Sequence, residues 1–241
     1  MSMNLFIPIL LLLTNSCDQH GTNDYNSKTT SQYLHVVKGE LSKEWPDNRT
    51  INLVFHGHSV PAGYFETPFV NTFDSYPFQV LKKLKAKYPY AVINVINTSV
   101  GGETSVSGQK RFETEVLNHS PDILLIDYAL NDRGVGLEES RKAWVKMIES
   151  AKQDGIKIIL LTPSPDLRVN LSDSDNELEK HAIQIRELAQ KYNIGLADSY
   201  SSFKQIQVDC DCLSEYMSQS NHPNKKGHVV IAQEIMKYFN R

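Results

Sequence analysis

Short apolar runs alternate along this chain with longer amphipathic stretches, from about residue 50 to the C-terminus. The runs predict strands over 51–55, 91–96, 123–126, 156–161 and 195–197. Apolar residues at helical spacing predict helices over 73–87, 138–153, 176–192 and 225–239. Because the longer runs are apolar at nearly every position, both faces of the sheet must be covered by other elements. The pattern predicts an α/β protein, a three-layer α/β/α sandwich with a central parallel sheet.

The first 32 residues do not follow this pattern. Residues 5–13 form an apolar run that is too short to span a bilayer but has the length of the hydrophobic region of a signal peptide. The run leads to Thr14-Asn15-Ser16-Cys17, which resembles a bacterial lipoprotein signal with cleavage before Cys17 and lipid on its thiol, although residues 1–4 carry no Lys or Arg. An ordinary secretory signal or a disordered N-terminus is the alternative. We expect a signal peptide at 1–17, a flexible tether at 18–32 and one domain at 33–241.

The composition of the chain limits the classes of partner that we expect it to bind. The chain has 241 residues, a net charge of −3, and 22% charged residues, with no basic patch that would favour nucleic acid. We therefore expect no nucleic-acid partner, and contact with a membrane only through the N-terminal lipid. Besides Cys17 there are only Cys210 and Cys212, which form a disulfide or remain two thiols. With no further cysteine to complete a thiolate metal site, a structural role is favoured for this pair.

Several residues that could take part in catalysis come directly after predicted strands in the sequence. Ser59 comes just after the strand at 51–55, at the edge of a parallel sheet where an α/β protein exposes a nucleophile. A serine needs a base, and His222 precedes the last predicted helix. Gly102 and Asn131 follow two other strands and offer a backbone N–H and a side-chain amide for an oxyanion. Taken singly, each of these residues fits an ordinary turn or helix cap.

In this order the four segments resemble the blocks of the SGNH (GDSL-like) hydrolase superfamily, over roughly residues 50–240. The resemblance implies a flavodoxin-like SGNH hydrolase fold. It implies that Ser59 is the nucleophile and that His222 is the general base. It further implies an oxyanion hole made by the N–H of Ser59, the N–H of Gly102 and the side chain of Asn131.

The chain departs from the family pattern in the first, the third and the last of the four blocks. His58 stands where the first block usually has Asp, and Leu130 where the third has Gly. Gln219 replaces the usual acid three residues before His222; glutamine can orient an imidazole by hydrogen bonding but cannot stabilise its charge. We favour a dyad oriented by Gln219 or by a backbone carbonyl over a triad completed by an acid from elsewhere. The upstream candidates for such an acid are Asp209, Asp211 and Glu215.

The resemblance implies a serine esterase that cleaves carboxylic esters through an acyl-enzyme and needs no cofactor. An exported location favours deacetylation of a carbohydrate, with a small ester or an acylated glycan as substrate; lipase, thioesterase and acyltransferase activities stay open. The aromatic segment 61–77 either walls the site or forms a buried loop. Two other functions are alternatives: a catalytically impaired glycan-binding protein on the SGNH scaffold, and a metal-dependent hydrolase using His56 and His58.

Overall fold

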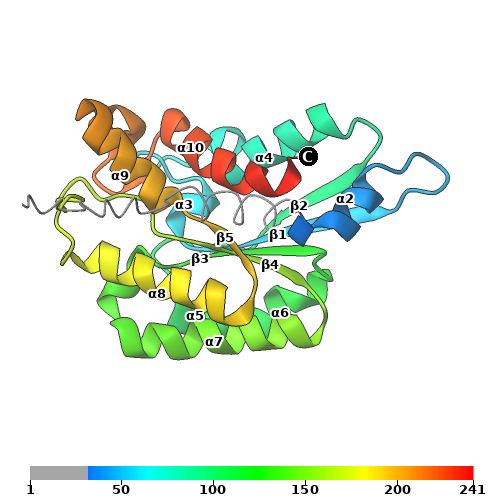
Figure 1. Ribbon diagram of the computed structural model, residues 1–241, viewed down its shortest axis with the longest axis horizontal. Helices are drawn as coiled ribbons and strands as arrows, with labels where there is room; N and C mark the ends of the chain where they lie inside the picture. The colour runs from blue at the N-terminus through cyan, green and yellow to red at the C-terminus, as the bar shows by residue number, and fades with distance from the viewer. Residues whose placement is uncertain (1–31, 241) are drawn as a thin grey trace, which may run out of the picture.

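The computed structural model describes residues 32–240, and a parallel five-stranded sheet lies at its centre (Figure 1). The strands are β1 (Thr50–Gly57), β2 (Val92–Asn97), β3 (Ile123–Asp127), β4 (Lys157–Leu161) and β5 (Gly195–Ala197). Their order is β2-β1-β3-β4-β5, and every neighbouring pair is parallel. This is the flavodoxin-like order, so the predicted fold class is confirmed. The expected signal peptide, the lipidation site Cys17 and almost all of the tether lie outside the described residues.

Helices cover both faces of the sheet (Figure 1). One face carries α2 (His35–Leu41), α4 (Tyr76–Lys87), α9 (Ser199–Cys210) and α10 (Lys225–Met236). The other carries α5 (Ser105–Lys110), α6 (Phe112–Glu115), α7 (Leu137–Gln153) and α8 (Glu177–Tyr192). A short helix, α3 (Ser59–Ala62), follows β1 directly. Single turns of 3₁₀ helix lie at η1 (Thr72–Asp74), η2 (Leu117–His119), η3 (Asn131–Gly134), η4 (Leu213–Tyr216) and η5 (Lys237–Phe239).

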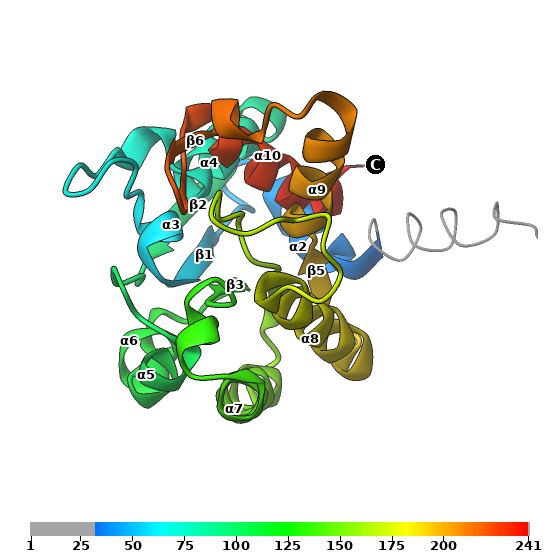
Figure 2. The same ribbon diagram turned by 90° about the vertical axis from the view of Figure 1, so that its left-hand side faces the viewer.

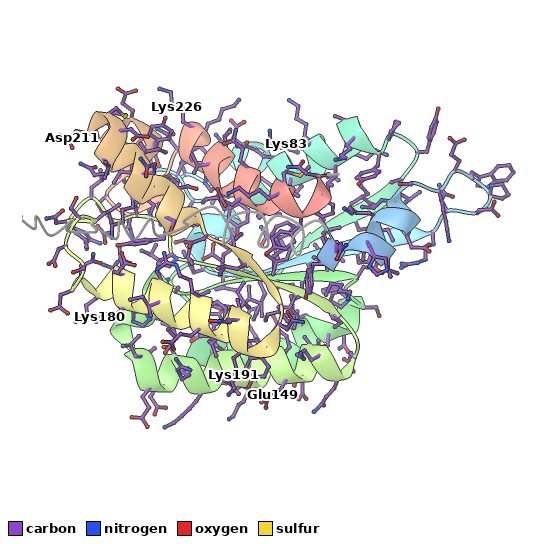
Figure 3. The ribbon with its side chains drawn as sticks, in the orientation of Figure 1. Lys83, Glu149, Lys180, Lys191, Asp211 and Lys226 are labelled. Atoms are coloured by element: carbon purple, nitrogen blue, oxygen red, sulfur yellow. A yellow bond between two sulfur atoms is a disulfide. The ribbon has the colours of Figure 1, made fainter. Side chains whose placement is uncertain are left out.

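The apolar core is divided by the sheet into two clusters. Along β1, Leu53 and Phe55 belong to one cluster, and Val54 belongs to the other. This alternation follows from the two-residue period of a strand, and it explains why the run at 51–55 is apolar throughout. Charged side chains of the helices project outward on both sides, as Lys83 of α4 and Lys191 of α8 show in Figure 3. No helix within residues 32–240 has the length and apolar content needed to cross a bilayer.

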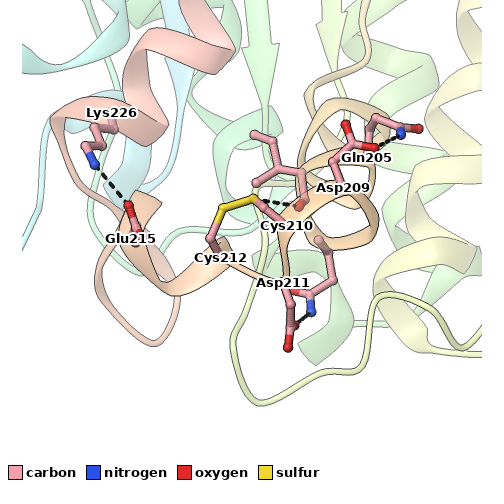
Figure 4. Close-up of a disulfide and its surroundings, with 9 residues drawn as sticks. Gln205, Asp209, Cys210, Asp211, Cys212, Glu215 and Lys226 are labelled. Atoms are coloured by element: carbon pink, nitrogen blue, oxygen red, sulfur yellow. Dashed lines mark hydrogen bonds and ion pairs between the residues drawn. A yellow bond between two sulfur atoms is a disulfide. The ribbon is translucent and has the colours of Figure 1, made fainter.

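The structure contains the short helices α2, α5 and α6, which the sequence pattern did not predict, and two longer helical regions also differ from the prediction. The helix predicted over 73–87 is divided, because Ser75 is extended between η1 and α4. Helix α9 was not predicted, because it carries few apolar residues and buries mainly Tyr200 and Phe203. It ends beside a disulfide between Cys210 and Cys212, which decides between the two states expected for this pair (Figure 4).

The carboxyl ends of the strands meet at one end of the molecule, which faces the viewer in Figure 2. Helix α3 and a small hairpin of β6 (Met217–Gln219) and β7 (His222–Pro223) lie at this end. The hairpin is fixed to the start of α10 by Asn224, whose side chain accepts hydrogen bonds from the N–H groups of Lys226 and Gly227 and donates to the carbonyl of Glu215. The fold therefore brings the end of β1 and the hairpin together.

Candidate active site

Ser59 is the first residue of α3, immediately after β1, and only 8% of its surface is exposed. The strand end is held tightly against β3: a Cβ on Gly57 would lie 2.4 Å from the carbonyl oxygen of Asp127, so only glycine fits there. His58 caps the helix, and its Nδ1 accepts a hydrogen bond from the N–H of Val60 at 3.3 Å. Ser59 is thus placed at the β1/β3 boundary, where ligands bind in sheets of this order.

His222 lies next to Ser59 although the two residues are far apart in the sequence, since His222 belongs to β7 near the C-terminus. Its Nε2 lies 2.9 Å from the Oγ of Ser59, within hydrogen-bond distance. Burial lowers the pKa of His222, the hydrogen bond to the Phe65 carbonyl raises it in part, and the neighbouring His58 has a smaller lowering effect. The ring is therefore neutral near pH 7, and its Nε2 can accept the proton of Ser59, as a general base requires.

The second nitrogen of His222 is held by a backbone carbonyl. Nδ1 lies 3.1 Å from the oxygen of Phe65, so we assign the ring proton to Nδ1 and leave Nε2 as the acceptor for Ser59. The N–H of Phe65 is in turn bonded to the carbonyl of Phe69 at 3.1 Å, which closes a tight turn. The ring of Phe65 stacks on His228 at 4.9 Å, and burial lowers the pKa of His228 to about 3. A backbone acceptor has no sequence signature, so residue patterns could not reveal which carbonyl takes this place.

Gln219 does not orient His222 directly, and this expectation is corrected. Its Oε1 accepts from the N–H of Thr67 at 3.0 Å, and its Nε2 lies 3.3 Å from the Thr67 hydroxyl. The side chain is thus engaged by the loop two residues beyond Phe65, while the Phe65 carbonyl occupies the ring nitrogen. Gln219 consequently bonds to the same turn that supplies the acceptor for His222.

The acids considered upstream of His222 are engaged elsewhere. Glu215 lies 3.2 Å from the ammonium of Lys226, and Asp209 accepts from Gln205 at 2.6 Å (Figure 4). Asp211 accepts from Gln207 just past the end of α9. None of the three has a hydrogen bond to His222 in the described part of the chain. The arrangement is a Ser59–His222 pair oriented by a carbonyl.

Gly102 lies on a loop that the end of β1 holds in place. The N–H of Thr98 bonds to the carbonyl of Phe55 at 2.9 Å, and that of Val100 to the carbonyl of Gly57 at 3.0 Å. Gly102 has φ +78°, a backbone conformation that residues other than glycine rarely adopt. A Cβ at this position would have no heavy atom within 4 Å. Glycine is therefore required by the backbone conformation of the loop and not by lack of space.

Asn131 opens η3 after β3, and its amide is already partly oriented. Its Nδ2 donates to the carbonyl of Glu103 at 2.9 Å, which uses one of the two amide hydrogens and leaves the second for a ligand. Glu103 is held by Arg111 through its Nε at 2.8 Å, and by the hydroxyl of Tyr128 at 2.8 Å. Burial raises the pKa of Glu103, but these two partners outweigh it and keep the carboxylate ionised. Sequence reasoning missed this ion pair. Leu130, which replaces the usual glycine, is buried in the core.

His56 and His58 do not converge on a common point as the metal alternative requires. Nδ1 of His56 lies 2.9 Å from the hydroxyl of Thr98, and its Nε2 lies 3.1 Å from that of Tyr128. Burial lowers the pKa of His56 to about 3. Between residues 32 and 240 there is no group of three His, Cys, Asp or Glu side chains placed to hold a metal ion. The bonds of His56 link the Gly102 loop to β3.

The aromatic segment 61–77 combines both expected roles. The ring of Tyr64 lies 6.2 Å from that of His222, and Phe65 supplies the carbonyl described above, so this part walls the site. Tyr76 is buried, whereas Phe69 and Phe73 are 73% and 84% exposed. Only the first part of the segment contacts the candidate catalytic residues.

With this geometry established, the chain can be compared with known proteins. It matches the GDSL-like Lipase/Acylhydrolase family over residues 55–230, which is most of its length. The chain belongs to this family. It is a carboxylic ester hydrolase by that membership, and the SGNH resemblance of its motifs is confirmed.

Among individual relatives, the chain is 22% identical to an acetylxylan esterase of Geobacillus stearothermophilus over 75% of this chain and 87% of that protein. The structure of that organism's acetylxylan esterase Axe2 superposes with a TM-score of 0.69 at 21% identity, covering 79% and 94% of the two chains. A two-domain esterase active on acetylated mannans gives 0.69 at 20% identity, covering 86% of this chain and 52% of that one. Solved catalytic mutants of Axe2 replace a serine, a histidine and an aspartate.

The uncharacterized lipoprotein YqeF of Bacillus subtilis is 31% identical over 86 residues, which is 32% of this chain. The match spans 35% of the lipoprotein's length.

Proposed function

We propose that the protein is a serine esterase that removes acetyl groups from a carbohydrate through an acyl-enzyme on Ser59. The observation that carries the proposal is the 2.9 Å contact between Ser59 Oγ and His222 Nε2, with the opposite ring nitrogen fixed by the Phe65 carbonyl. The contact gives a weak nucleophile a neutral base in the tautomer that it needs.

The proposed reaction has two halves. His222 Nε2 takes the proton of Ser59 as its Oγ attacks the ester carbonyl carbon, and the resulting oxyanion accepts hydrogen bonds from the N–H of Ser59, the N–H of Gly102 and the amide of Asn131. The C–O bond to the alcohol then breaks, and His222 returns the proton to that oxygen. Water repeats the sequence on the acyl-enzyme: His222 removes its proton, the acid leaves, and Ser59 recovers its hydrogen.

The carbonyl at Nδ1 has a definite consequence for this mechanism. It fixes the ring orientation and tautomer as a triad acid does, but it offers the imidazolium a dipole in place of a full negative charge. The cationic intermediate of His222 is therefore less stabilised by its direct neighbour than it would be in a Ser-His-Asp site.

The choice of an acetylated carbohydrate is supported by the substrates named for two similar structures, acetylated xylan and acetylated mannan. Both share the fold of this chain at low identity, so the acyl and sugar groups have to be measured. The decisive experiment compares p-nitrophenyl esters of two to eight carbons with acetylated xylo- and manno-oligosaccharides. We expect the fastest turnover on acetyl esters, and a preference for long acyl chains would refute the proposal.

The residues are tested on the same substrates. Ser59→Ala and His222→Ala should each lose at least about 10³-fold in kcat while remaining folded. A fluorophosphonate probe should label Ser59 in the wild type. An unlabelled, inactive wild-type protein that still binds acetylated oligosaccharides would instead support the impaired glycan-binding alternative.

We also propose that the protein is exported and anchored by lipid at Cys17. The apolar run at 5–13 ahead of that cysteine and the partial match to a bacterial lipoprotein support this. Expression in a bacterial host with labelled palmitate should give a labelled membrane-bound protein, and Cys17→Ser should abolish the label. Equal labelling of both proteins would exclude this anchor.

A further inference from the structure

Two buried polar atoms face each other beneath the proposed nucleophile. Nε2 of His58 lies 3.4 Å from Oδ1 of Asp127, the last residue of β3. Both residues are buried, and neither atom has a hydrogen-bond partner within the described residues, so their contact is an ion-pair contact without hydrogen-bond geometry. The second carboxylate oxygen of Asp127 accepts from the hydroxyl of Tyr76 at 3.0 Å. Orphaned buried polar atoms are uncommon in proteins, so this pair needs an explanation.

The remaining contacts of His58 lead to the active site. Its Nδ1 accepts from the N–H of Val60, so in the neutral ring the proton resides on Nε2, the ring nitrogen nearest to Asp127. The same Nδ1 lies 3.5 Å from the Oγ of Ser59. The carboxylate of Asp127, the ring of His58, the hydroxyl of Ser59 and the ring of His222 thus follow one another at separations of 3.4, 3.5 and 2.9 Å.

Between residues 32 and 240, no lysine or arginine forms an ion pair with this carboxylate. Two other buried acids are held by cations: Asp166 bonds to Arg133 and Arg168, and Glu179 bonds to Arg186 and Lys204. Buried Asp132 has neutral donors instead, the indole of Trp144 and the N–H of Ser105. Among the residues that the structure describes, the side chain of Asp127 contacts the phenol of Tyr76 and the imidazole of His58. A carboxylate buried with neutral partners is costly to stability, and such costs tend to be retained at functional sites.

We propose that the Asp127–His58 pair is a positioning unit that supplies, on the far side of Ser59, the negative charge that His222 lacks. This inference rests on the proposed roles of Ser59 and His222. When His222 takes the serine proton it becomes a cation, and the charge of Asp127 stabilises it across His58 and Ser59. The pair also fixes the His58 tautomer that caps α3, and it thereby holds Ser59 in place.

The size of the effect follows from the geometry. The three contacts and the width of one imidazole place the carboxylate within about 12 Å of His222 Nε2, where a full charge moves a pKa by about one unit at an effective dielectric constant of 20. The other titratable groups near this line are His228, Tyr76 and Asp132, and burial raises the pKa of Asp132. His228 stays neutral behind Phe65, and Tyr76 is a buried phenol. Asp132 is bonded to the indole of Trp144 and to a backbone N–H.

The test is the isosteric variant Asp127→Asn, assayed on the acetyl ester with Ser59→Ala and His222→Ala alongside. We expect kcat to fall about 10- to 100-fold with KM changed less than threefold, and the acidic limb of the kcat profile to move down by about one pH unit. The limb moves down because loss of a nearby negative charge makes the imidazolium of His222 less stable. Tyr76→Phe removes a hydrogen bond but keeps the charge, so its acidic limb should stay at the wild-type pH.

A second variant separates the effect of the His58 ring on catalysis from its role in capping α3. His58→Asn keeps an acceptor that can cap α3 but removes the ring between Asp127 and Ser59, and we expect it to lower kcat without a large loss of thermal stability. An Asp127→Asn enzyme with wild-type kcat and an unmoved limb would overturn the inference, and so would a lowered melting temperature with an unmoved limb. If Ser59→Ala were fully active, the proposed function itself would fail, which is a distinct outcome.

Discussion

The most informative single substitution is Gln219→Asp, because it restores the residue type that the family pattern has at this position. If Gln219 is merely a defective triad acid, the carboxylate should recover the lost charge stabilisation. The corresponding change in a serine protease, between Asp and Asn, alters kcat by about 10⁴. On that interpretation Gln219→Asp should raise kcat by orders of magnitude.

The structure leads to the opposite expectation. The Nδ1 of His222 is already bonded to Phe65 at 3.1 Å, and the Gln219 side chain makes two contacts with Thr67, at 3.0 and 3.3 Å. Aspartate is one methylene shorter and has no N–H to donate to the Thr67 hydroxyl. Two partly exposed hydrogen bonds are worth about 1–2 kcal/mol together, so we expect kcat to fall about 5- to 30-fold as the turn carrying Phe65 loosens.

Steady-state kinetics on an acetyl ester, with Gln219→Glu as the control for charge at unchanged length, distinguishes the two cases. A loose turn disturbs only the orientation of His222, so kcat should fall more than KM rises. Thr67→Val removes only the hydroxyl contact and should produce a smaller loss of the same kind. A tenfold or greater rise in kcat for Gln219→Asp would refute the assignment of the Phe65 carbonyl as the orienting group.

Further predictions concern the groups around the site. Asn131→Ala should lower kcat by about 10²- to 10³-fold with little change in KM, because an oxyanion donor acts mainly in the transition state. Arg111→Met leaves Glu103 without its cation and should destabilise the protein by about 2–3 kcal/mol in urea unfolding, whereas Arg111→Lys should retain part of the pair. Since burial lowers the pKa of His222 and only the neutral ring is a base, kcat should rise with pH through a midpoint below 6.5; a midpoint above 6.5 would contradict this. His228 has a folded pKa of about 3, so the unfolded chain binds its proton first, and the contribution of His228 to stability should fall below pH 6.5 by up to about 1.4 kcal/mol per pH unit. His56 adds a slope of the same sign, so the total slope should be flatter in His228→Gln without disappearing.

The sequence by itself determined the layers of this protein and the positions of its candidate chemistry. Apolar runs and helical spacing are local signals, so the parallel sheet and the helices α4, α7, α8 and α10 followed from the order of residues. The role of Gly102 in a tight turn could also be predicted from the sequence, since such a turn after a strand favours glycine. The weakly apolar helix α9 lacked such a signal and was missed.

Only the tertiary structure decided how Ser59 and His222 are supported. The carbonyl of Phe65, the engagement of Gln219 by Thr67, and the contact of His58 with Asp127 all join segments that are distant in the chain or depend on backbone atoms. Backbone acceptors carry no residue signature, and a side chain's partner depends on which loops the fold brings together. For that reason residue types could place a serine and a histidine at one sheet edge, but the three-dimensional arrangement alone shows what takes the place of the acid.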